Sequence, residues 1–467
     1  MTMQCKQRAQ ERPYFRPGAS TRRRGQRGAA SLIVVMVLFF MMSLVAAYTS
    51  RNLIFEQRTS VNQYRSTQAY EAAEAGLEWA LAQLNGGRID PNCLEADAAA
   101  TDTSFRQRYL GINTNPPPAV ASGMITALTQ AVAGAPPRRA GCVWTGAAWS
   151  CSCPSDSNPA LAAPVGGTGV YPAFWVSFST LNVSRPGVVQ IVATGCTRPD
   201  TDCLGSTANS TNVEGRALVT TLVALKGAIA TPPVAALTVF GAVDRTGAVG
   251  TLSVFNTDGQ NGGVTIQASG AVALGNVVLG GLPGTPGSES IVQNDPSMNL
   301  PAPIPAAGVT AQDREFASTF SMWPRTAQWQ PGAVRLFPPP LPLCPATGCS
   351  VAVSNAVLMN PDRVIWVDGD LTLEAANIIG SLANPALIIV TGSLKVVPIG
   401  GVRVFGLIYT RSGNWSGSGE IQGAAIAEGD LAATAAQTVV YNAGVLDTLR
   451  LRAGSFVRVP GGWRDFP

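Results

Sequence analysis

The chain has 467 residues, which is room for two or three domains of ordinary size. Only 13% of the residues are charged and 46% are apolar, so the chain is too apolar to be disordered. Its 49 Gly and 34 Pro argue against a helical bundle and favour strands joined by many turns. Because the sequence contains no His, Ser-His-Asp catalysis, Cys-His catalysis and most zinc sites are excluded.

The net charge of +4 arises at the N-terminal end of the chain. Residues 1–28 contain eight Lys and Arg against the single acid Glu11, so the remainder of the chain is mildly acidic. A basic tail on an acidic body does not have the charge pattern of a nucleic-acid-binding domain. We therefore expect no nucleic acid among the partners of this protein.

An uncharged segment follows the basic tail. Residues 29–50 carry no charged side chain, and as a helix they would span about 33 Å, enough to cross a bilayer. The arginines before this segment should stay in the cytoplasm, which places the C-terminal body on the far side of the inner membrane, in the periplasm. No small-residue cleavage site follows the apolar core, as it would in an ordinary secretory signal.

The helix is expected to continue beyond the membrane. Residues 51–84 contain no Pro, and Asn85-Gly86-Gly87 is a helix stop. Apolar residues recur at steps of three to four, often across a polar residue, as on one face of a helix. They are Leu53, Val61, Tyr64, Ala72, Ala75 and Trp79. The segment 29–85 therefore predicts one long helix, apolar all round in its first half and amphipathic in its second.

The start of this helix resembles a known signal. Arg27-Gly28 followed by Ala29, after a short basic leader, is similar to a class III-type prepilin signal. The later stretch 68–76, which contains Glu71 and Glu74, resembles the end of the N-terminal domain of PilX-type minor pilins. The resemblance covers about residues 25–85, and the alternative for the same residues is a plain single-span membrane anchor.

The resemblance implies a processing pathway and a set of partners. A prepilin peptidase would cut after Gly28, remove the leader 1–28, and leave Ala29 as a methylated N-terminus. Glu71 and Glu74 would lie on the helix that packs in the filament. The implied partners are other minor pilins, the major pilin and a PilY-type tip adhesin, with the inner membrane holding the subunit before assembly.

One position departs from the pilin pattern. Most pilins carry Glu at the fifth mature position, where it pairs with the N-terminal ammonium of the next subunit, but here that position is Ile33. A buried ion pair is costly unless both partners are present. A subunit that lacks the Glu is tolerated where no subunit lies above it, so Ile33 predicts a place at or near the filament tip. Pseudopilins of the K type share this lack.

The cysteines point to an oxidising compartment. Cys5 lies in the leader, and the other eight lie on the translocated side, where they can form up to four disulfides. Cys196 with Cys203 and Cys344 with Cys349 are plausible local loops. The remaining four, which would then pair among themselves, are Cys93, Cys142, Cys151 and Cys153. The alternative is a metal cluster around Cys151-Ser-Cys153.

The chain after the helix is expected to form two parts. Residues 86–230 would be a disulfide-containing, pilin-like α/β head, loop-like up to residue 165 and then rich in strands at 174–179, 188–194 and 216–225. The resemblance to pilins implies that these strands form an antiparallel sheet on the amphipathic half of the helix. The fold class is therefore α+β.

The second part, residues 231–467, contains a repeat. Residues 364–373 align with 387–396 and with 424–433, and fainter copies lie at 264–274 and 409–415. Apolar runs that turn at a Gly about every 20 residues suit the coils of a β-solenoid, and a β-sandwich with similar hairpins is the alternative. A Pro-rich insertion, 281–350, is expected to be an ordered excursion whose aromatic residues Trp323, Trp329 and Phe337 lie on the solenoid, or else a flexible linker.

Carboxylates at the repeat are the candidates for catalysis or Ca²⁺ binding. They are Asp368, Asp370, Glu374, Glu428 and Asp430. Asp is common at such turns for local hydrogen bonding, and the sequence has no phosphate-binding loop and no nucleophile elbow. We therefore expect neither an enzyme nor a cofactor or metal. The sequence predicts an assembly and priming subunit of a type IV pilus, at the tip and contributing to adhesion. The alternatives are a K-type pseudopilin of a type II secretion system and a membrane-anchored surface-binding protein outside a filament.

Overall fold

The computed structural model describes residues 28–97, 101–115, 122–128, 138–166, 170–181, 185–199, 215–299, 309–374, 377–397 and 401–465. The chain divides into two compact units, Met1–Gln63 and Tyr64–Pro467. Helix α1 (Gly28–Leu84) supplies the described part of the first unit and the beginning of the second. Of the expected leader 1–28, all but Gly28 lies outside the described residues.

Helix α1 ends at the predicted stop. The N–H of Asn85 donates to the carbonyl of Ala82 at 3.1 Å, which satisfies one of the carbonyls left free at a helix end. The side chain of Asn85 forms two hydrogen bonds with the backbone of Phe456, at 3.0 and 2.8 Å. The residue that follows the helix therefore also ties it to the last strand of the chain.

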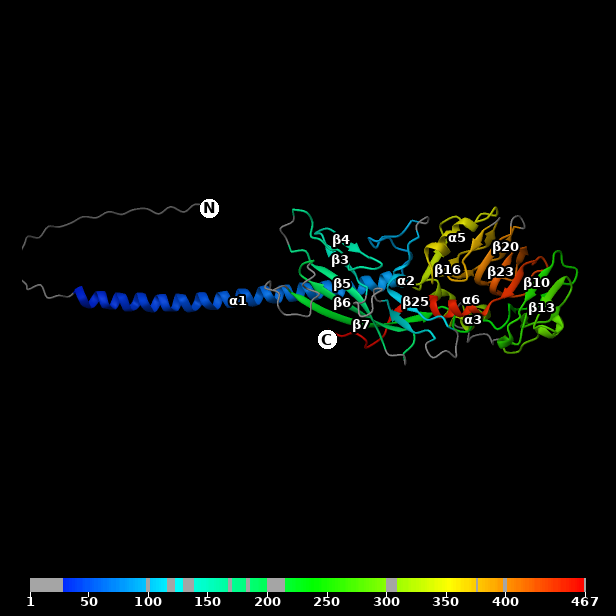
Figure 1. The fold of residues 1–467 in the computed structure, drawn as a ribbon, viewed down its shortest axis with the longest axis horizontal. Coiled ribbons are helices and arrows are strands. Elements are labelled where there is room, and N and C mark those ends of the chain that lie inside the picture. Colours follow the sequence, from blue (N-terminus) through cyan, green and yellow to red (C-terminus); the bar gives the residue numbers. More distant parts are fainter. Residues whose placement is uncertain are drawn as a thin grey trace, which may run out of the picture. The chain divides into compact units, whose positions relative to one another are not determined.

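An antiparallel sheet lies along the second half of α1 (Figure 1). Its strands are β3 (Ala140–Trp144), β4 (Trp149–Ser152), β5 (Ala173–Thr180), β6 (Val188–Cys196), β7 (Arg216–Gly227) and β25 (Gly454–Arg458). They are ordered β25-β7-β6-β5-β3-β4. Strands β5, β6 and β7 contain the three runs expected from the sequence. Strands β3 and β4 lie in the segment expected to be loop-like, because Gly, Ser and Cys interrupt their apolar pattern.

The last strand departs from the expected division of the chain. Strand β25 lies within 231–467, yet it pairs antiparallel with β7, with Phe456 opposite Leu225. The chain thus leaves the sheet after β7 and returns to it near the C-terminus. The antiparallel sheet is built from both of the expected parts, so the boundary at residue 230 holds only for the strands before it.

Small residues allow α1 and the antiparallel sheet to approach each other closely. The core between them contains Ala73, Leu77, Ala80 and Leu84 of the helix, packed with residues such as Phe174 of the sheet. A Cβ on Gly195 of β6 would lie 2.0 Å from the carbonyl oxygen of Ala69, so only glycine allows this approach.

The buried face of α1 agrees with the predicted one in part: Ala72 is buried, and Ala75 and Trp79 pack partly buried against the core. Leu53, Val61 and Tyr64 are 58%, 47% and 65% exposed, so the first three residues of the predicted face lie outside the core. They are exposed because they lie in the part of α1 before Arg65, where every described side chain is exposed. The buried positions that the pattern of larger apolar residues did not single out are Ala69, Ala73, Leu77 and Ala80.

A short segment joins α1 to this sheet. Helix α2 (Phe105–Tyr109) begins at Ser104, whose side chain accepts a hydrogen bond from the N–H of Gln107. Strand β1 (Leu110–Ile112) follows at once and pairs antiparallel with β2 (Ile125–Ala127). Helix α2 carries Arg106 and Arg108 into the core, where both side chains are almost completely buried.

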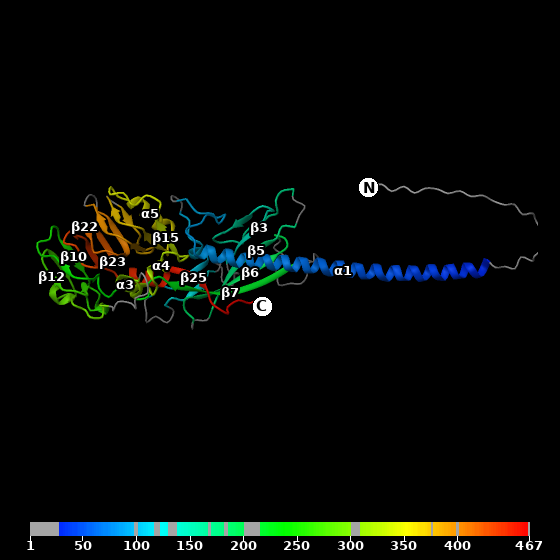
Figure 2. The ribbon, with the colours of Figure 1, turned by 180° about the vertical axis from the view of Figure 1, so that it is seen from behind.

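The rest of the body is a stack of parallel strands (Figure 2). A 12-stranded sheet contains β8 (Leu237–Phe240), β10 (Leu252–Phe255), β11 (Ile266–Ala268), β13 (Val277–Gly280), β14 (Ile291–Val292), β15 (Ala333–Leu336), β16 (Val364–Val367), β18 (Ile378–Ile379), β19 (Ala386–Val390), β21 (Arg403–Thr410), β23 (Glu420–Glu428) and β24 (Thr438–Tyr441). Two smaller sheets contain β17 (Leu371–Leu373), β20 (Leu394–Val396) and β22 (Trp415–Gly417), and β9 (Val243–Asp244) with β12 (Val272–Ala273).

These strands pair in the register at which the sequence repeat aligns. Val364 lies opposite Leu387, and Leu371 lies opposite Leu394, so the first two copies are neighbours in both sheets. The degenerate copy at 409–415 follows them, with Trp415 opposite Leu394. Apolar residues that face inward from these strands form one continuous core.

Glycine permits the stack to turn between the sheets. The N–H of Gly392 donates to the carbonyl of Gly369 at 2.9 Å, so equivalent corners of two copies lie directly on one another. A Cβ on Gly413, in the next copy, would lie 1.9 Å from the carbonyl oxygen of Asp430. Close backbone approach therefore requires Gly at 392 and 413, whereas Gly369 and Gly429 have φ of 91° and 72°, a conformation that favours glycine.

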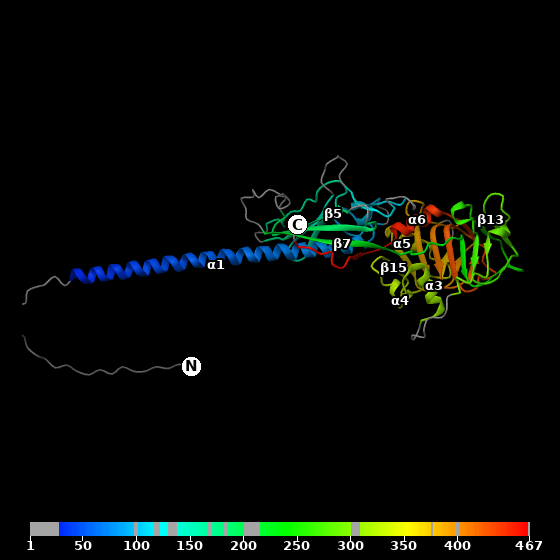
Figure 3. The same cartoon turned by 90° about the horizontal axis from the view of Figure 1, so that it is seen from below.

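The order of the copies in space differs from their order in the chain (Figure 3). Strand β8 pairs with β23, so that Leu237 lies opposite Ala425. Strand β11 then pairs with β8, and β14 with β11. Residues 237–292 therefore continue the stack beyond its C-terminal copies, although they precede those copies in the sequence.

Helices cover two sides of the stack. They are α3 (Ala311–Phe320), α4 (Pro324–Ala327), α5 (Ser350–Met359) and α6 (Ala443–Arg452), and two short 3-10 turns, η2 (Gly259–Asn261) and η3 (Gly287–Ser290), complete the elements. The described parts of 281–350 are thus an ordered excursion. Its buried aromatic residues are Phe316 and Phe320, whereas Trp323 and Trp329, expected to lie on the stack, are 43% and 70% exposed. Phe337 is partly buried against the core.

Candidate functional site

The first half of α1 presents an exposed apolar surface. From Leu32 to Leu44 the large apolar side chains are 51–73% exposed, and Ile33 is 61% exposed. By length and composition the helix can cross a membrane. Apolar surface of this extent is not stable in water, so this segment requires lipid or the helices of other proteins around it.

The following turns of α1 are one-sided. Ala73, Leu77 and Ala80 face the sheet, whereas Glu71 and Glu74 are exposed. The hydroxyl of Tyr70 donates to a carboxylate oxygen of Glu74 at 2.9 Å. This arrangement leaves a polar face of the helix available next to the packed one.

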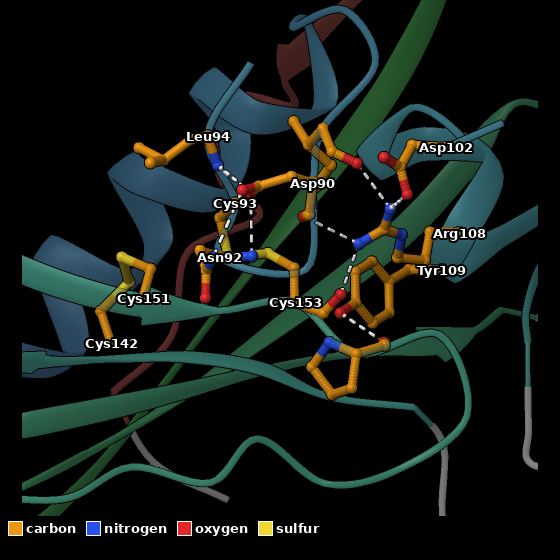
Figure 4. The surroundings of a disulfide bond; sticks show 12 residues. Asp90, Asn92, Cys93, Leu94, Asp102, Arg108, Tyr109, Cys142, Cys151 and Cys153 are labelled. Carbon is orange, nitrogen blue, oxygen red and sulfur yellow. Dashed lines mark hydrogen bonds and ion pairs between the residues drawn. A yellow bond between two sulfur atoms is a disulfide. The ribbon is translucent and has the colours of Figure 1, made fainter. Parts of the chain in front are cut away.

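One disulfide fastens the segment after α1 to the edge of the sheet, and a second joins the two strands at that edge (Figure 4). Cys93 pairs with Cys153, at a Cα separation of 5.3 Å, and Cys142 of β3 pairs with Cys151 of β4. The four cysteines that the sequence left to pair among themselves therefore do so. Both members of Cys151-Ser-Cys153 are in disulfides, which overturns the metal-cluster alternative.

One of the two expected local loops is confirmed. Cys344 pairs with Cys349 across five residues. Cys196 is also disulfide-bonded, and its expected partner Cys203 lies outside the described residues. No group of three or more His, Cys, Asp or Glu side chains in the described ranges is arranged to hold a metal ion.

Arg108 reinforces the clamped segment. Its guanidinium donates to the carbonyl oxygens of Ile89 at 2.6 Å, of Asp90 at 3.0 Å and of Cys153, and it lies 3.6 Å from the carboxylate of Asp102 (Figure 4). The side chain is only 5% exposed. One buried cation therefore satisfies three carbonyls around the Cys93–Cys153 disulfide.

Arg106 joins the antiparallel sheet to the parallel stack. Its guanidinium donates to four carbonyl oxygens from three places in the chain. They belong to Leu84 at 2.9 Å, Arg452 at 2.9 Å, Gly454 at 3.1 Å and Asp362 at 3.3 Å. The guanidinium carbon also lies 4.8 Å from the ring centre of Phe456. Burial lowers the pKa of Arg106 to about 10, so the group remains charged at neutral pH.

The comparisons with known proteins identify the helix. Residues 27–78 match the family model of the PilX N-terminal region. The chain carries the N-terminal segment of a PilX-type pilin. The match covers the exposed apolar surface and most of the turns that pack on the sheet, which agrees with the resemblance seen in the sequence.

Structural comparison adds little to the family match. One similar solved structure is the crystal structure of the competence-associated pilin ComZ from Thermus thermophilus. It shares 12% identity over 86% of this chain and 97% of that chain, and the TM-score is 0.17, too low to support an argument. No match was found among curated proteins.

The carboxylates weighed for catalysis have structural partners. Asp368 forms an ion pair with Arg335 at 2.6 Å. The carboxylates of Asp370, Glu374 and Asp430 accept backbone N–H bonds from Ser393, Ser350 and Ala242, between 2.7 and 3.1 Å long. These carboxylates fasten neighbouring copies of the repeat and the helix α5 to one another.

Glu428 differs from the other four carboxylates because its side chain is fully buried. It accepts a hydrogen bond from the hydroxyl of Tyr409 at 2.7 Å and lies 3.2 Å from the guanidinium of Arg411. Arg411 also pairs with Asp313 of α3 at 2.7 Å, and Glu315 lies nearby. Burial is the main cause that raises the pKa of Glu428, and likewise that of Glu315, to about 7. The cluster holds α3 against the stack.

Sequence reasoning missed the two buried arginines, Arg106 and Arg108. They lie in the run Phe105-Arg106-Gln107-Arg108-Tyr109, where two charges stand among aromatic residues in a chain that is only 13% charged. Charged residues at alternate positions between buried aromatic ones are a signal for interior cations. The carbonyls that they bind lie up to 348 residues away, which no local pattern indicates.

Proposed function

We propose that this protein is a minor pilin of a type IV pilus, an assembly and priming subunit at or near the filament tip. The observation that carries the proposal is the PilX N-terminal match over an exposed apolar helix that continues into a sheet-packed head. Pilins use such a helix twice, first as a membrane anchor and then as the filament core.

Processing would convert one use into the other. A prepilin peptidase cuts after Gly28, the new N-terminal residue Ala29 is methylated, and the helix leaves the inner membrane sideways. Its exposed apolar side chains exchange lipid for the helices of other minor pilins and of the major pilin, with no net exposure to water. The body then moves from the periplasm to the cell surface.

Ile33 supports a place at the tip. At the fifth mature position it offers no carboxylate to the N-terminal ammonium of a subunit above it, and an unpaired ammonium in an apolar core is strongly unfavourable. The protein would therefore terminate the helical array instead of interrupting it. A PilY-type adhesin is a further expected partner there.

The large body suits the same place. We propose that the parallel stack is a β-solenoid, a reading supported by the parallel register of the repeat and its Gly corners. Its bulk is easier to accommodate once at the tip than repeatedly along a filament, and it would contribute to adhesion. The proposed role is structural, with no catalysis, cofactor or nucleic acid.

The N-terminus of the protein in sheared filaments tests the proposal. Mass spectrometry of the mature protein is expected to find a methylated Ala29 start. The variant Gly28→Val should remain full length and be absent from filaments, whereas Gly25→Val, within the leader, should be processed normally. An unprocessed wild-type protein, or a Gly28→Val variant with unchanged mass and piliation, would instead identify a membrane-anchored surface protein.

A second candidate is a K-type pseudopilin of a type II secretion system. The absence of Glu at Ile33 and the large body favour it, because pseudopilins of that type share both features. Deletion of the gene separates the candidates. Loss of twitching with intact protein secretion supports the pilus, and loss of secretion with intact twitching supports the pseudopilus.

A further inference from the structure

Helix α3 packs against the parallel stack near the last residues of β21 and β23 (Figure 3). Its side chains Phe316 and Phe320 are buried, and their ring centres lie 5.3 and 5.1 Å from that of Tyr409. Apolar contacts of this kind do not depend on pH. Any effect of pH on the position of α3 must therefore arise from its polar contacts.

The two ends of α3 are held by different interactions. Near its C-terminal end, the carbonyl of Thr319 accepts the N–H groups of Ala230 at 2.9 Å and Thr231 at 3.2 Å. At its N-terminal end, the carboxylate of Asp313 pairs with the guanidinium of Arg411 at 2.7 Å. The backbone hydrogen bonds do not titrate, whereas the ion pair belongs to a cluster of titratable groups. The N-terminal turns are therefore the part of α3 whose attachment can respond to pH.

The cluster at this end contains more acids than bases. Asp313 and Glu315 of α3 and Glu428 of β23 lie around the guanidinium of Arg411. Arg411 divides its donors between Asp313 at 2.7 Å and Glu428 at 3.2 Å. The fully buried Glu428 also accepts a hydrogen bond from the hydroxyl of Tyr409 at 2.7 Å. With all of these acids ionised, the negative charges of the cluster would outnumber the positive charge of Arg411.

Glu315 has the least support among these acids. In the part of the chain that the structure describes, its buried Oε2 atom has no hydrogen-bond partner. Burial is the main cause that raises the pKa of Glu315 to about 7, and the charge of Glu428 is the next. Burial likewise raises the pKa of Glu428 to about 7. Two neighbouring carboxyls that are shielded from water do not ionise independently, so the pair retains a proton up to near neutral pH.

The neighbouring strands place apolar side chains around the cluster. Phe240 of β8 lies opposite Glu428 in the sheet, and the ring of Trp366 of β16 lies 5.9 Å from that of Phe316. Arg314, the remaining charged residue of α3, is half-buried. Charged residues of other nearby elements pair with one another, Asp368 with Arg335 and Asp447 with Arg450. Apolar surroundings strengthen the repulsion between the charges that they enclose.

We propose that pH controls the docking of α3 on the parallel stack. The helix packs fully while Glu315 and Glu428 share a proton, and its N-terminal turns leave the stack when both are ionised and the proton has passed to water. Movement of these turns would carry Asp313 and Glu315 into solvent and uncover Phe316, while the hydrogen bonds of Thr319 hold the other end. The open form would present an apolar surface that the docked form buries. This inference stands on the acid cluster and does not depend on the proposed pilus function.

The direction and size of the effect follow from the two forms of the pair. The pKa is about 7 when α3 is docked and falls towards the ordinary value of 4.5 when the carboxyls meet water. Because the docked form binds the proton more tightly, opening should become more favourable between about pH 4.5 and 7 and then level off. For one proton and complete solvation, the rise from pH 5 to pH 8 is about 70-fold. We expect at least about tenfold, since Glu428 stays on the stack and is only partly solvated.

Hydrogen exchange of the full chain in detergent micelles tests the inference. Exchange is followed by mass spectrometry between pH 5 and 8, and the rates are corrected for the intrinsic pH dependence of amide exchange. We expect the protection of residues 312–318 to fall at least about tenfold over this range, whereas that of β19, in the core of the stack, should stay within about twofold.

Variants assign the effect to the pair. Glu315→Gln and Glu428→Gln should each reduce the fall in protection, and the double variant should bring it to within about twofold. Glu289→Gln, at an exposed position outside the cluster, should keep the wild-type fall. Glu315→Gln alone serves if the variants at Glu428 do not fold. Constant protection of α3 in the wild type, an unchanged fall in Glu315→Gln, or an equal fall in β19 would overturn the inference.

Discussion

Replacement of Arg106 is the most direct test of how the body is held together. The variant Arg106→Met keeps most of the side-chain volume but removes the donors to Leu84, Arg452, Gly454 and Asp362. A buried carbonyl left without a partner costs about 1–3 kcal/mol. Loss of the guanidinium also removes the cost of burying its charge. We therefore expect each of the four carbonyls to cost about 1 kcal/mol, the lower end of this range, and the free energy of unfolding to fall by about 4 kcal/mol in total.

Two measurements report this loss. Urea unfolding of the full chain in detergent should show a lower midpoint, and hydrogen exchange should accelerate at residues 452–456 and at the end of α1. The urea midpoint of Arg106→Lys should lie between those of the wild type and Arg106→Met, because an ammonium group reaches fewer of the carbonyls. Arg458→Met removes an exposed ion pair with Glu78 and should cost less than about 1 kcal/mol. An Arg106→Met protein within about 0.5 kcal/mol of the wild type would refute the reasoning.

Three further predictions concern the disulfides, the corners and the buried acid. Replacing both Cys93 and Cys153 with Ser should lower the free energy of unfolding in urea by about 4 kcal/mol, because that disulfide closes a loop of 60 residues. Replacing both Cys344 and Cys349 should lower it by about 2 kcal/mol, because the loop is only 5 residues long. Equal losses would contradict the chain-entropy argument. Gly413→Ala should cost about 1–3 kcal/mol by crowding the carbonyl of Asp430, whereas Gly259→Ala, with open space around it, should be nearly neutral in the same assay. Burial raises the pKa of Glu428 to about 7, above its value in the unfolded chain. The contribution of this group to the free energy of unfolding should therefore be fully present below about pH 4.5 and be lost as the pH rises through 7. A Glu428→Gln protein should show a shallower fall in urea midpoint between pH 5 and 8, and an unchanged slope would exclude this group.

Local patterns predicted the elements whose causes are local. The uncharged run before Arg51 and the stop at Asn85 gave the extent of α1, and recurring Gly gave the register of the stack. The paired loop of Cys344 and Cys349 followed from short spacing. In each case the residues that form the structure are close in the chain.

Long-range contacts account for what the sequence did not reveal. The sequence pattern did not show where along α1 burial begins, because the partners of the helix, such as Phe174, lie about a hundred residues on, and alanine contacts leave no strong pattern. Trp329 was expected to lie on the stack but is 70% exposed, with Arg335 over its ring at 4.5 Å, while Phe316 is buried against the stack. Strand β25 carried no signal that its partner would be β7.

The pairing of β8 with β23 has a consequence for how the protein is made. Residues 237–292 are synthesised before 420–428, the segment on which they stack. Until residues 420–428 have been synthesised, strand β8 lacks its partner β23, and the uncharged stretch after Gly259 cannot complete its place in the stack. Completion of the middle of the stack, rather than of either end, is therefore the late step of folding. A chain truncated before residue 420 would lack β23, the strand with which β8 pairs, although it would still contain β8.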